Sequence, residues 1–454
     1  MLKTLSRPLV RISERWLPSA LTFAVILTAI VAVLALLLTD AGPVDVVRGW
    51  GDGLIGLLAF MTQMALILLL GHMLANTGPV RRLLTRAASV PRTAPQAYGF
   101  VALCAAVASL ITWGLGLVVA ALLSIEVARS GRERGLKLHF PLLVASGYSG
   151  YVVWHMGYSG SGPLAVATPG SDVANQLGTT IPVTDTIFTW WNIVGIVLAV
   201  AVVVVTMARL APSGDDPVVE LPAGADLARE ESELLDTRSG EGPTPAERLD
   251  GSRVITTALG VALLAYLVTY YAQEGFVLTL DIVNWTFLCL VMLLVKSPAE
   301  LGRLVVDAAR NVGDILLQFP LYAGILGIMT GSGLIAVFAD FFVSISNEYT
   351  LGLWAFLAGG LINMFVPSGG GQFAVQAPIF FEAAAKLGVD PSIVTMGIAY
   401  GDQWTNMIQP FWALPLLAIA RLRIRDIMGF TAVTLIVTGF VFAFTIMLPA
   451  WFGA

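Results

Sequence analysis

Long apolar runs separated by short polar segments are the feature that most limits the fold of this chain. Residues 21–38, 54–70 and 431–448 are three such runs, and each approaches the roughly 20 residues that an α-helix needs to cross a bilayer core. Charged residues make up only 12% of the 454 residues, against about 25% in soluble domains. The sequence therefore predicts an all-α polytopic membrane protein.

The distribution of lysine and arginine between the runs predicts the topology. Short loops rich in these residues remain in the cytoplasm, and the segments 81–92, 129–137 and 421–425 are of this kind. The flank before the first run is also basic, so we predict a cytoplasmic N-terminus and an external C-terminus. Residues 1–40 are interpreted as a retained anchor, because no small-residue cleavage site closes the first run.

Two apolar stretches begin and end on the same side of the membrane. Residues about 97–128 lie between two basic loops, whereas residues about 350–388 have external flanks. Each stretch is too long for a single crossing. The first is shorter than two full crossings require, and the second is interrupted at 367–372. We therefore predict two re-entrant helical hairpins, with tips at 112–116 and 367–372.

The two halves of the chain show weak internal matches in the same order. Tyr148 and Pro163 align with Tyr400 and Pro415 without a gap. Because the first hairpin is predicted to enter from the cytoplasm and the second from outside, the pattern indicates an inverted repeat, which is typical of secondary carriers. The predicted parts are a first membrane repeat (1–210), a polar cytoplasmic linker (211–252), and a linking span with the second repeat (253–454).

Discontinuous helices are predicted at about 139–165 and 392–420, where glycine and proline interrupt apolar sequence. Broken backbone at membrane depth is tolerated only where it is buried in protein or lines a cavity, and free N–H groups at helix starts suit a carboxylate. The alternative is that these glycines only allow close helix packing. The candidate substrate-binding residues are Thr112, Trp113, Gly114, Ser159, Ser161, Ser368, Gly369, Gly370, Gly371, Gln372, Thr405, Asn406 and Gln409.

Two ionisable residues in the broken segments are candidates for a coupling-ion site. Asp402 is an acid within a predicted break, and His155 lies in the corresponding segment of the first half; intramembrane ionisable groups are functional candidates. Each also has a structural interpretation as a hydrogen-bonded buried group. The tryptophans near the breaks, Trp113, Trp154, Trp404 and Trp412, are either an apolar wall for an acyl chain or ordinary packing residues. No metal, cofactor or nucleic acid is expected.

Several segments resemble the bacterial short-chain fatty acid transporter family. They include 158–163 (YSGSGP), 366–371 (VPSGGG) and 403–415, together with 15–18, 50–53, 63–66 and 425–429. The resemblance covers nearly the whole chain. It implies uptake of acetoacetate, butyrate or related acids in a bacterial inner membrane, and membership of an ion-transporter superfamily of homodimeric, elevator-type carriers.

The sequence thus predicts a secondary active transporter that binds a small carboxylate within the lipid bilayer, with a proton or sodium ion as the coupling ion. Alternatives remain open. They are a sodium-coupled dicarboxylate carrier or an exporter on the same fold, a passive channel, and a membrane-embedded enzyme such as an intramembrane protease. An intramembrane protease is disfavoured, because this sequence has no second aspartate in a comparable break and no His-Glu-x-x-His motif.

Overall fold

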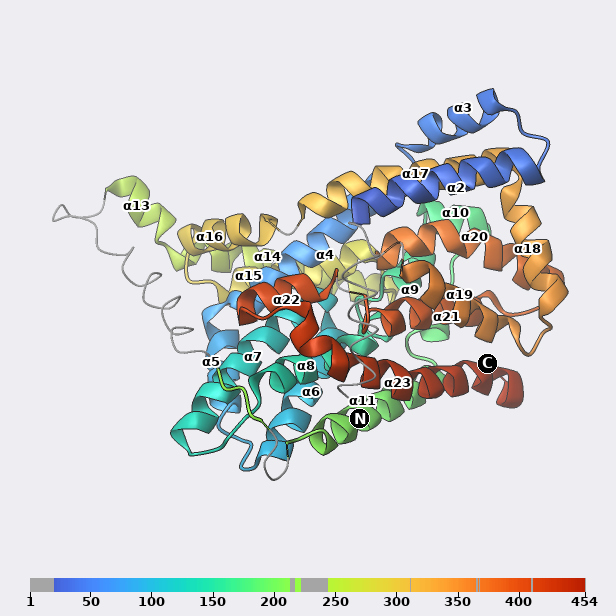
Figure 1. The fold of residues 1–454 in the computed structure, drawn as a ribbon. Coiled ribbons are helices and arrows are strands. Elements are labelled where there is room, and N and C mark those ends of the chain that lie inside the picture. The colour runs from blue at the N-terminus through green and yellow to red at the C-terminus, as the bar shows by residue number, and fades with distance from the viewer. Residues whose placement is uncertain are drawn as a thin grey trace.

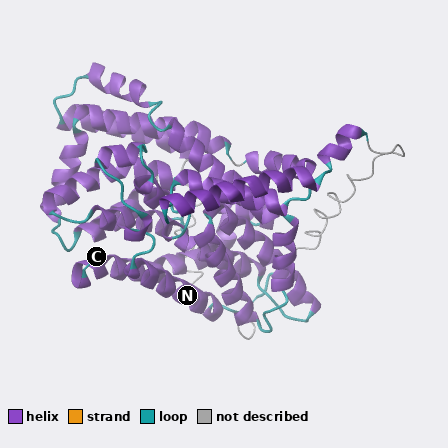
Figure 2. Ribbon diagram, turned by 180° about the vertical axis from the view of Figure 1, so that it is seen from behind, coloured by secondary structure: helices purple, strands orange, loops and turns teal. Residues whose placement is uncertain are grey.

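The computed structural model consists of helices joined by short loops (Figures 1 and 2). It describes residues 20–212, 217–221, 244–310, 312–364, 366, 368–409 and 411–453. No strand occurs among these residues, which confirms the all-α class. The basic flank at 1–19, most of the linker predicted at 211–252, Pro367 in the second hairpin tip and Pro410 lie outside the described residues.

The first part of the chain contains both short and long helices. They are α2 (Ala20–Leu38), α3 (Pro43–Gly53), α4 (Leu58–Asn76), α5 (Gly78–Ala87), α6 (Ala94–Ile111), α7 (Trp113–Glu133), α8 (Phe140–Gly150), the 3-10 helix η1 (Tyr151–Met156), α9 (Ser161–Ala167), α10 (Asp172–Leu177), η2 (Val183–Asp185) and α11 (Trp190–Arg209).

The second part begins with a short helix at the end of the predicted linker. Its elements are α13 (Pro245–Asp250), α14 (Arg253–Glu274), α15 (Leu280–Leu294), α16 (Pro298–Ala309), α17 (Gly313–Ser332), α18 (Leu334–Ile345), α19 (Leu351–Asn363), α20 (Gly369–Leu387), α21 (Pro391–Thr405), α22 (Ala413–Ala420) and α23 (Ile424–Phe452).

Seven of the described helices are long and apolar enough to cross a bilayer, namely α4, α6, α7, α11, α14, α17 and α23. Helix α14 shows how the outer surface is built. Only 17% of its most apolar window is buried within the protein, and Val254, Val261 and Val268 are exposed along it, as expected for a helix in contact with lipid. These helices confirm a multi-pass membrane protein.

Helices α6 and α7 form the first hairpin. They pack against each other and are joined at Thr112, whose extended backbone (φ −155°, ψ 135°) interrupts the helical path. The stretch is longer than predicted, because the two arms contain 18 and 21 residues. The expectation that it is too short for two crossings is therefore wrong, and its re-entrant character remains a prediction that now depends on where the tip lies.

Helices α19 and α20 form the second hairpin, at the other end of the molecule in Figure 1. Ser368 is the N-cap of α20, and its side chain accepts a hydrogen bond from the Gly371 N–H at 3.2 Å. A serine cap satisfies one of the N–H groups that a helix start leaves without an intrahelical acceptor. This cap fixes the direction in which α20 begins.

Each hairpin packs against a helix that changes path partway. Helix α8 continues as η1, then as an irregular turn around Gly157–Gly160 before α9. Helix α21 ends at Thr405, and α22 begins at Ala413. Helix α21 lies so close to α19 that a Cβ on Gly401 would be 2.2 Å from the Phe356 carbonyl oxygen. Only glycine fits there without displacing the backbone.

Residues 217–221, at the start of the predicted linker, are attached to the beginning of α8. The Phe140 N–H donates to the Val219 carbonyl oxygen at 2.7 Å, and the Val219 N–H donates to His139 Nδ1 at 3.0 Å. Leu221 is buried. The sequence predicted a solvated tether throughout this linker, but this part of it packs on the helices.

Candidate functional site

A small cavity lies where the two hairpin tips meet the interrupted helices. The described residues that line it are Met64, Trp113, Trp154, Ser161, Ile315, Gln318, Phe319, Ser368, Gly369, Gly370, Phe411 and Trp412. The space open to the centre of a water molecule is about 20 Å³, close to what one water needs. The site is therefore closed in this structure, and an organic ligand requires a movement of its walls.

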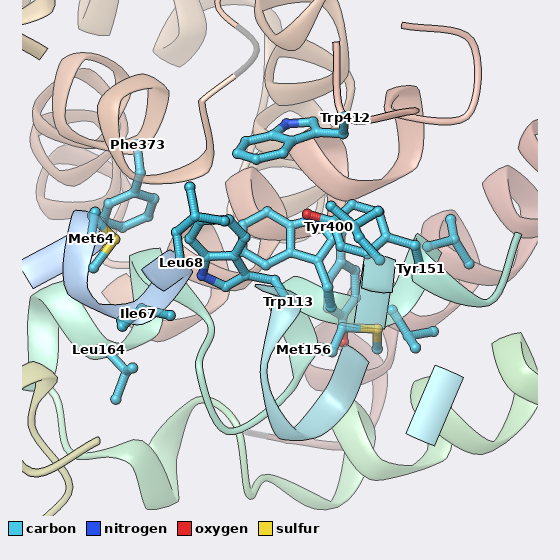
Figure 3. Packing of buried hydrophobic residues seen from close by; sticks show 14 of the residues in the cluster. Met64, Ile67, Leu68, Trp113, Tyr151, Met156, Leu164, Phe373, Tyr400 and Trp412 are labelled. Atoms are coloured by element: carbon cyan, nitrogen blue, oxygen red, sulfur yellow. The ribbon is translucent and has the colours of Figure 1, made fainter. Parts of the chain in front are cut away.

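Three tryptophans from three elements converge on the cavity. Trp113 begins α7, Trp154 lies in η1, and Trp412 immediately precedes α22. The ring centroid of Trp113 is 6.1 Å from that of Trp154 and 5.3 Å from that of Trp412, and Figure 3 shows the Trp113 and Trp412 side chains in the same packed region. These rings give the cavity an apolar wall. Trp404 is not part of it, because its Nε1 donates to the Leu435 carbonyl oxygen and its ring packs on Phe356.

The start of α20 supplies the polar side of the cavity. Gly369 and Gly370 are the first two residues of this 19-residue helix, where N–H groups have no preceding turn of carbonyls to bind. The helix dipole adds a partial positive charge at the same place. A Cβ on Gly369 would lie 2.3 Å from Trp154 Cη2, so glycine lets the helix start reach the aromatic wall.

The first hairpin tip differs from the second in this respect. The Trp113 N–H at the start of α7 donates to Ser159 Oγ at 3.2 Å. One backbone donor of this tip, the Trp113 N–H that lies at the cavity, is thus already occupied, and Ser159 is its acceptor. The first tip contributes mainly an aromatic surface, whereas the second contributes N–H groups open to a ligand.

Asp402 and His155 form a buried pair beneath the cavity. The Gly162 N–H donates to His155 Nε2 at 2.9 Å, and His155 Nδ1 lies 2.8 Å from Asp402 Oδ2. Since Nε2 accepts, the ring proton is on Nδ1 and is donated to the carboxylate. The imidazole is therefore neutral in this arrangement and orients Asp402.

The second carboxylate oxygen of Asp402 has a different environment from the first. Oδ1 is buried and has no hydrogen-bond partner within the described part of the chain. An ionised carboxylate that lacks full hydrogen bonding in a buried site is costly. A Cβ on Gly369 would lie 3.3 Å from Asp402 Oδ2, so the acid is next to the start of α20.

The remaining candidate residues separate into two groups. Ser161 and Ser368 line the cavity, and their contact with a ligand stays a prediction; Gly371 lies one residue behind the cavity against Tyr322. Gly114 instead packs on α4, where its Cβ would be 3.1 Å from the Leu68 carbonyl oxygen. Gly114 therefore fits the close-packing interpretation.

Several polar candidates hold helices together and do not face the cavity. Asn363 on α19 donates to Thr405 Oγ1 at 2.9 Å and to Asn406 Oδ1 at 2.8 Å. Gln372 Nε2 donates to the Gly359 carbonyl oxygen at 2.7 Å, and Gln409 Oε1 accepts from the Phe411 N–H at 3.0 Å. Thr112 is fully buried at the tip, and its hydroxyl has no partner among the residues described.

Five lining residues escaped the sequence reasoning, namely Met64, Ile315, Gln318, Phe319 and Phe411. Four of them are apolar residues in apolar sequence, which carry no distinguishing signal. Gln318 is an exception, because it is a polar side chain within the apolar helix α17. The described residues include no group of three or more His, Cys, Asp or Glu side chains suited to a metal ion.

Comparison with known proteins gives a consistent result. Residues 1–449 match the family model described as short chain fatty acid transporter. A protein of Escherichia coli (strain K12) is 43% identical over 97% of this chain and 98% of its own length, and one of Haemophilus influenzae is 38% identical over the same shares. Both are provisionally named as short-chain fatty acid transporters.

Solved structures share the fold. The crystal structure of the Alcanivorax borkumensis YdaH transporter, described as having an unusual topology, has a TM-score of 0.59 at 17% identity, over 96% of this chain and 99% of that chain. Neisseria gonorrhoeae MtrF, described among antimetabolite efflux pumps, has a TM-score of 0.50 at 14% identity, over 97% of both chains. At these identities the likeness concerns the fold alone.

Proposed function

The chain belongs to the short chain fatty acid transporter family, and on this premise we propose that it is a secondary carrier for acetoacetate, butyrate or a similar small monocarboxylate. It is a multi-pass membrane transporter and not an enzyme. The proposed location is the bacterial inner membrane, with the N-terminus in the cytoplasm and the C-terminus outside.

The observation that carries this proposal is the pairing of free backbone donors with an aromatic wall. The carboxylate binds the N–H groups of Gly369 and Gly370 at the start of α20, with the hydroxyls of Ser161 and Ser368 beside it. The acyl chain lies against the tryptophan wall. No lysine or arginine is among the described residues that line the cavity, so helix dipoles replace a buried cation.

Coupling follows from the position of Asp402. An ionised Asp402 and a bound carboxylate would share one buried region next to Gly369. Two like charges about 6 Å apart repel by roughly 3 kcal/mol at an effective dielectric constant of about 20. The carboxylate therefore binds well only when a proton or a sodium ion neutralises Asp402, with His155 as the positioning residue.

Alternating access completes the proposed mechanism. The hairpins are re-entrant elements of an inverted repeat, and the part of the protein that carries them moves as an elevator against a scaffold within a homodimer. The tips support this view because both line one cavity although their hairpins lie toward opposite ends of the molecule (Figure 1). A dicarboxylate is a weaker candidate, since among the described lining residues Gly369 and Gly370 at the start of α20 are the ones we assign to a carboxylate.

Uptake into proteoliposomes tests the proposal. Purified protein is reconstituted, and labelled butyrate or acetoacetate uptake is measured with an inward proton gradient, an inward sodium gradient, or neither. One gradient is expected to drive accumulation above the equilibrium level. Uptake no faster than in protein-free vesicles for every short acid tested would refute the function, and uptake that equilibrates without accumulation under both gradients would refute coupling.

A further inference from the structure

A second hollow lies at the end of the molecule that carries α5 and α16 (Figure 1). It has a volume of about 430 Å³, far larger than the central cavity. Its lining comes from five elements or their ends, and it includes His72, Asn76, Arg81, Leu117, Val118, Leu122, Asp307, Arg310, Pro415, Leu416, Ala418 and Ile419. We refer to this hollow as the basic groove.

The two walls of the basic groove differ in chemistry. One wall is apolar and comes from α7 and α22, with Leu122 and Ile419 partly exposed along it. The other wall includes Arg81 and Arg310. Such a surface matches an amphiphilic anion, whose charged end meets the arginines while its chain lies on the apolar wall.

The charges of the groove leave its two arginines available. His72 Nε2 lies 3.4 Å from Asp307 Oδ2, so the one carboxylate in the lining faces the imidazole. Within the described residues neither Arg81 nor Arg310 forms an ion pair. The lining therefore has an excess of positive charge even when His72 is neutral.

The basic groove also continues the helices that wall the central cavity. Leu117 is one helical turn beyond Trp113 on α7, and Pro415 and Leu416 follow Trp412 at the start of α22. Trp113 and Trp412 stand edge to face, with centroids 5.3 Å apart. This pair of rings therefore lies on the way from the groove to the cavity.

We propose that the basic groove is a second binding site, which holds a monocarboxylate with a short acyl chain before it enters, or after it leaves, the central cavity past Trp113 and Trp412. The carboxylate pairs with Arg81 and Arg310, and the chain contacts Leu122 and Ile419. The identity of this anion rests on the proposed function, whereas the anion site itself does not. A free acid and the head group of an anionic lipid share this chemistry, and the experiment distinguishes them.

The test measures the local potential and the occupancy of the groove without using transport. A single cysteine, Leu122→Cys, is placed in a Cys104→Ala/Cys289→Ala background and reconstituted in vesicles of neutral lipid. Its labelling rates with an anionic and a cationic methanethiosulfonate are compared at low salt. The double variant Arg81→Gln/Arg310→Gln removes two positive charges about 10 Å from the cysteine. The ratio of the anionic to the cationic labelling rate should then fall roughly threefold or more.

Arg303→Gln is the matched control. Arg303 lies on the same helix, α16, but it does not line the basic groove. It lines an adjoining surface hollow, which shares Asp307 and Arg310 with the groove, so its removal should change the ratio less. An equal change in the control, or no change in the double variant, would overturn the anion site. If Leu122→Cys does not fold, Ile419→Cys on the α22 part of the same apolar wall is used in the same way.

Protection identifies the ligand. Millimolar butyrate is expected to slow labelling of Leu122→Cys several-fold, butanol should not, and the protection should disappear in Arg81→Gln/Arg310→Gln. Protection by anionic-lipid vesicles but not by butyrate would overturn the assignment to a free acid. If butyrate protects the groove while no short acid is transported, the second site stands and the proposed function fails. If short acids are transported but butyrate gives no protection, the proposed function stands and the second site fails.

Discussion

Replacing Trp412 by alanine should change the acyl chain length that the carrier prefers. Trp412 is 8% exposed and lines the closed cavity, so its indole occupies space that added methylenes of a bound acid would need. If ligand surface replaces about 100 Å² of the indole, burial at about 25 cal/mol per Å² gives roughly 2.5 kcal/mol. This free energy corresponds to the burial of about three methylenes at about 0.8 kcal/mol each, and each buried methylene tightens binding roughly fourfold.

The assay is inhibition of labelled butyrate uptake in proteoliposomes by straight-chain acids from acetate to octanoate. For the native protein the inhibition constants should stop improving near butyrate. For Trp412→Ala they should keep falling, by roughly 60-fold in total over the next three methylenes. Because loss of a buried tryptophan costs about 3–5 kcal/mol of stability, Trp412→Leu provides a milder version with a smaller shift in the same direction.

Trp404→Phe is the control for this prediction. Trp404 is also a large aromatic residue close to a helix break, but it packs on Phe356 and does not line the cavity. Its variant should keep the native chain-length profile. An unchanged profile in folded Trp412→Ala, or the same shift in Trp404→Phe, would refute the assignment of Trp412 to the acyl-chain wall.

Three further predictions concern the centre of the protein. Asp402→Asn should abolish gradient-driven accumulation of butyrate but leave counterflow exchange within a few-fold of native, and retained accumulation would remove Asp402 as the coupling site. Gly369→Ala should raise the KM for butyrate at least tenfold, because its Cβ would lie 2.3 Å from Trp154; Gly331→Ala, whose Cβ meets nothing closer than 4.0 Å, should transport normally, and equal KM values would contradict the role of the α20 start. Asn363→Ala should destabilise the fold by about 3 kcal/mol, because the two N–H groups of Asn363 Nδ2 are shared among three buried acceptors, the Asp402 backbone carbonyl oxygen, Thr405 Oγ1 and Asn406 Oδ1. Thermal unfolding in detergent measures this loss, and a value below about 1 kcal/mol would show that these bonds are replaced.

The positions of the breaks could be predicted from sequence because glycine, proline and small polar residues are rare in apolar helices without a reason. The tip at Thr112, the start of α20 after Ser368, and the interruptions of α8 and α21 all follow this rule. For the tryptophans near the breaks the sequence allowed two interpretations, an apolar wall or ordinary packing. Three of them, Trp113, Trp154 and Trp412, converge on the cavity.

The direction of individual side chains could not be predicted. Gln372 and Thr405 look like ligand-binding residues in the sequence, yet both bind backbone carbonyls of α19. Burial of a polar group requires a partner, and neither composition nor spacing tells whether that partner is a ligand or a neighbouring helix. The same limit applied to Gly114, which packs on α4.

The hydrogen bond from the Gly162 N–H to His155 was also beyond sequence reasoning. It requires the irregular turn after η1 to fold back on the imidazole, with Gly162 N 2.9 Å from Nε2. Only this contact reveals the tautomer, and with it the division of roles between His155 and Asp402.

The tightness of the central cavity has a consequence for the cell that hosts the carrier. A chamber with space for about one water molecule cannot hold the continuous file of waters along which protons hop. In this closed arrangement the cavity therefore offers protons no path across the membrane, and the stored voltage is not discharged through it.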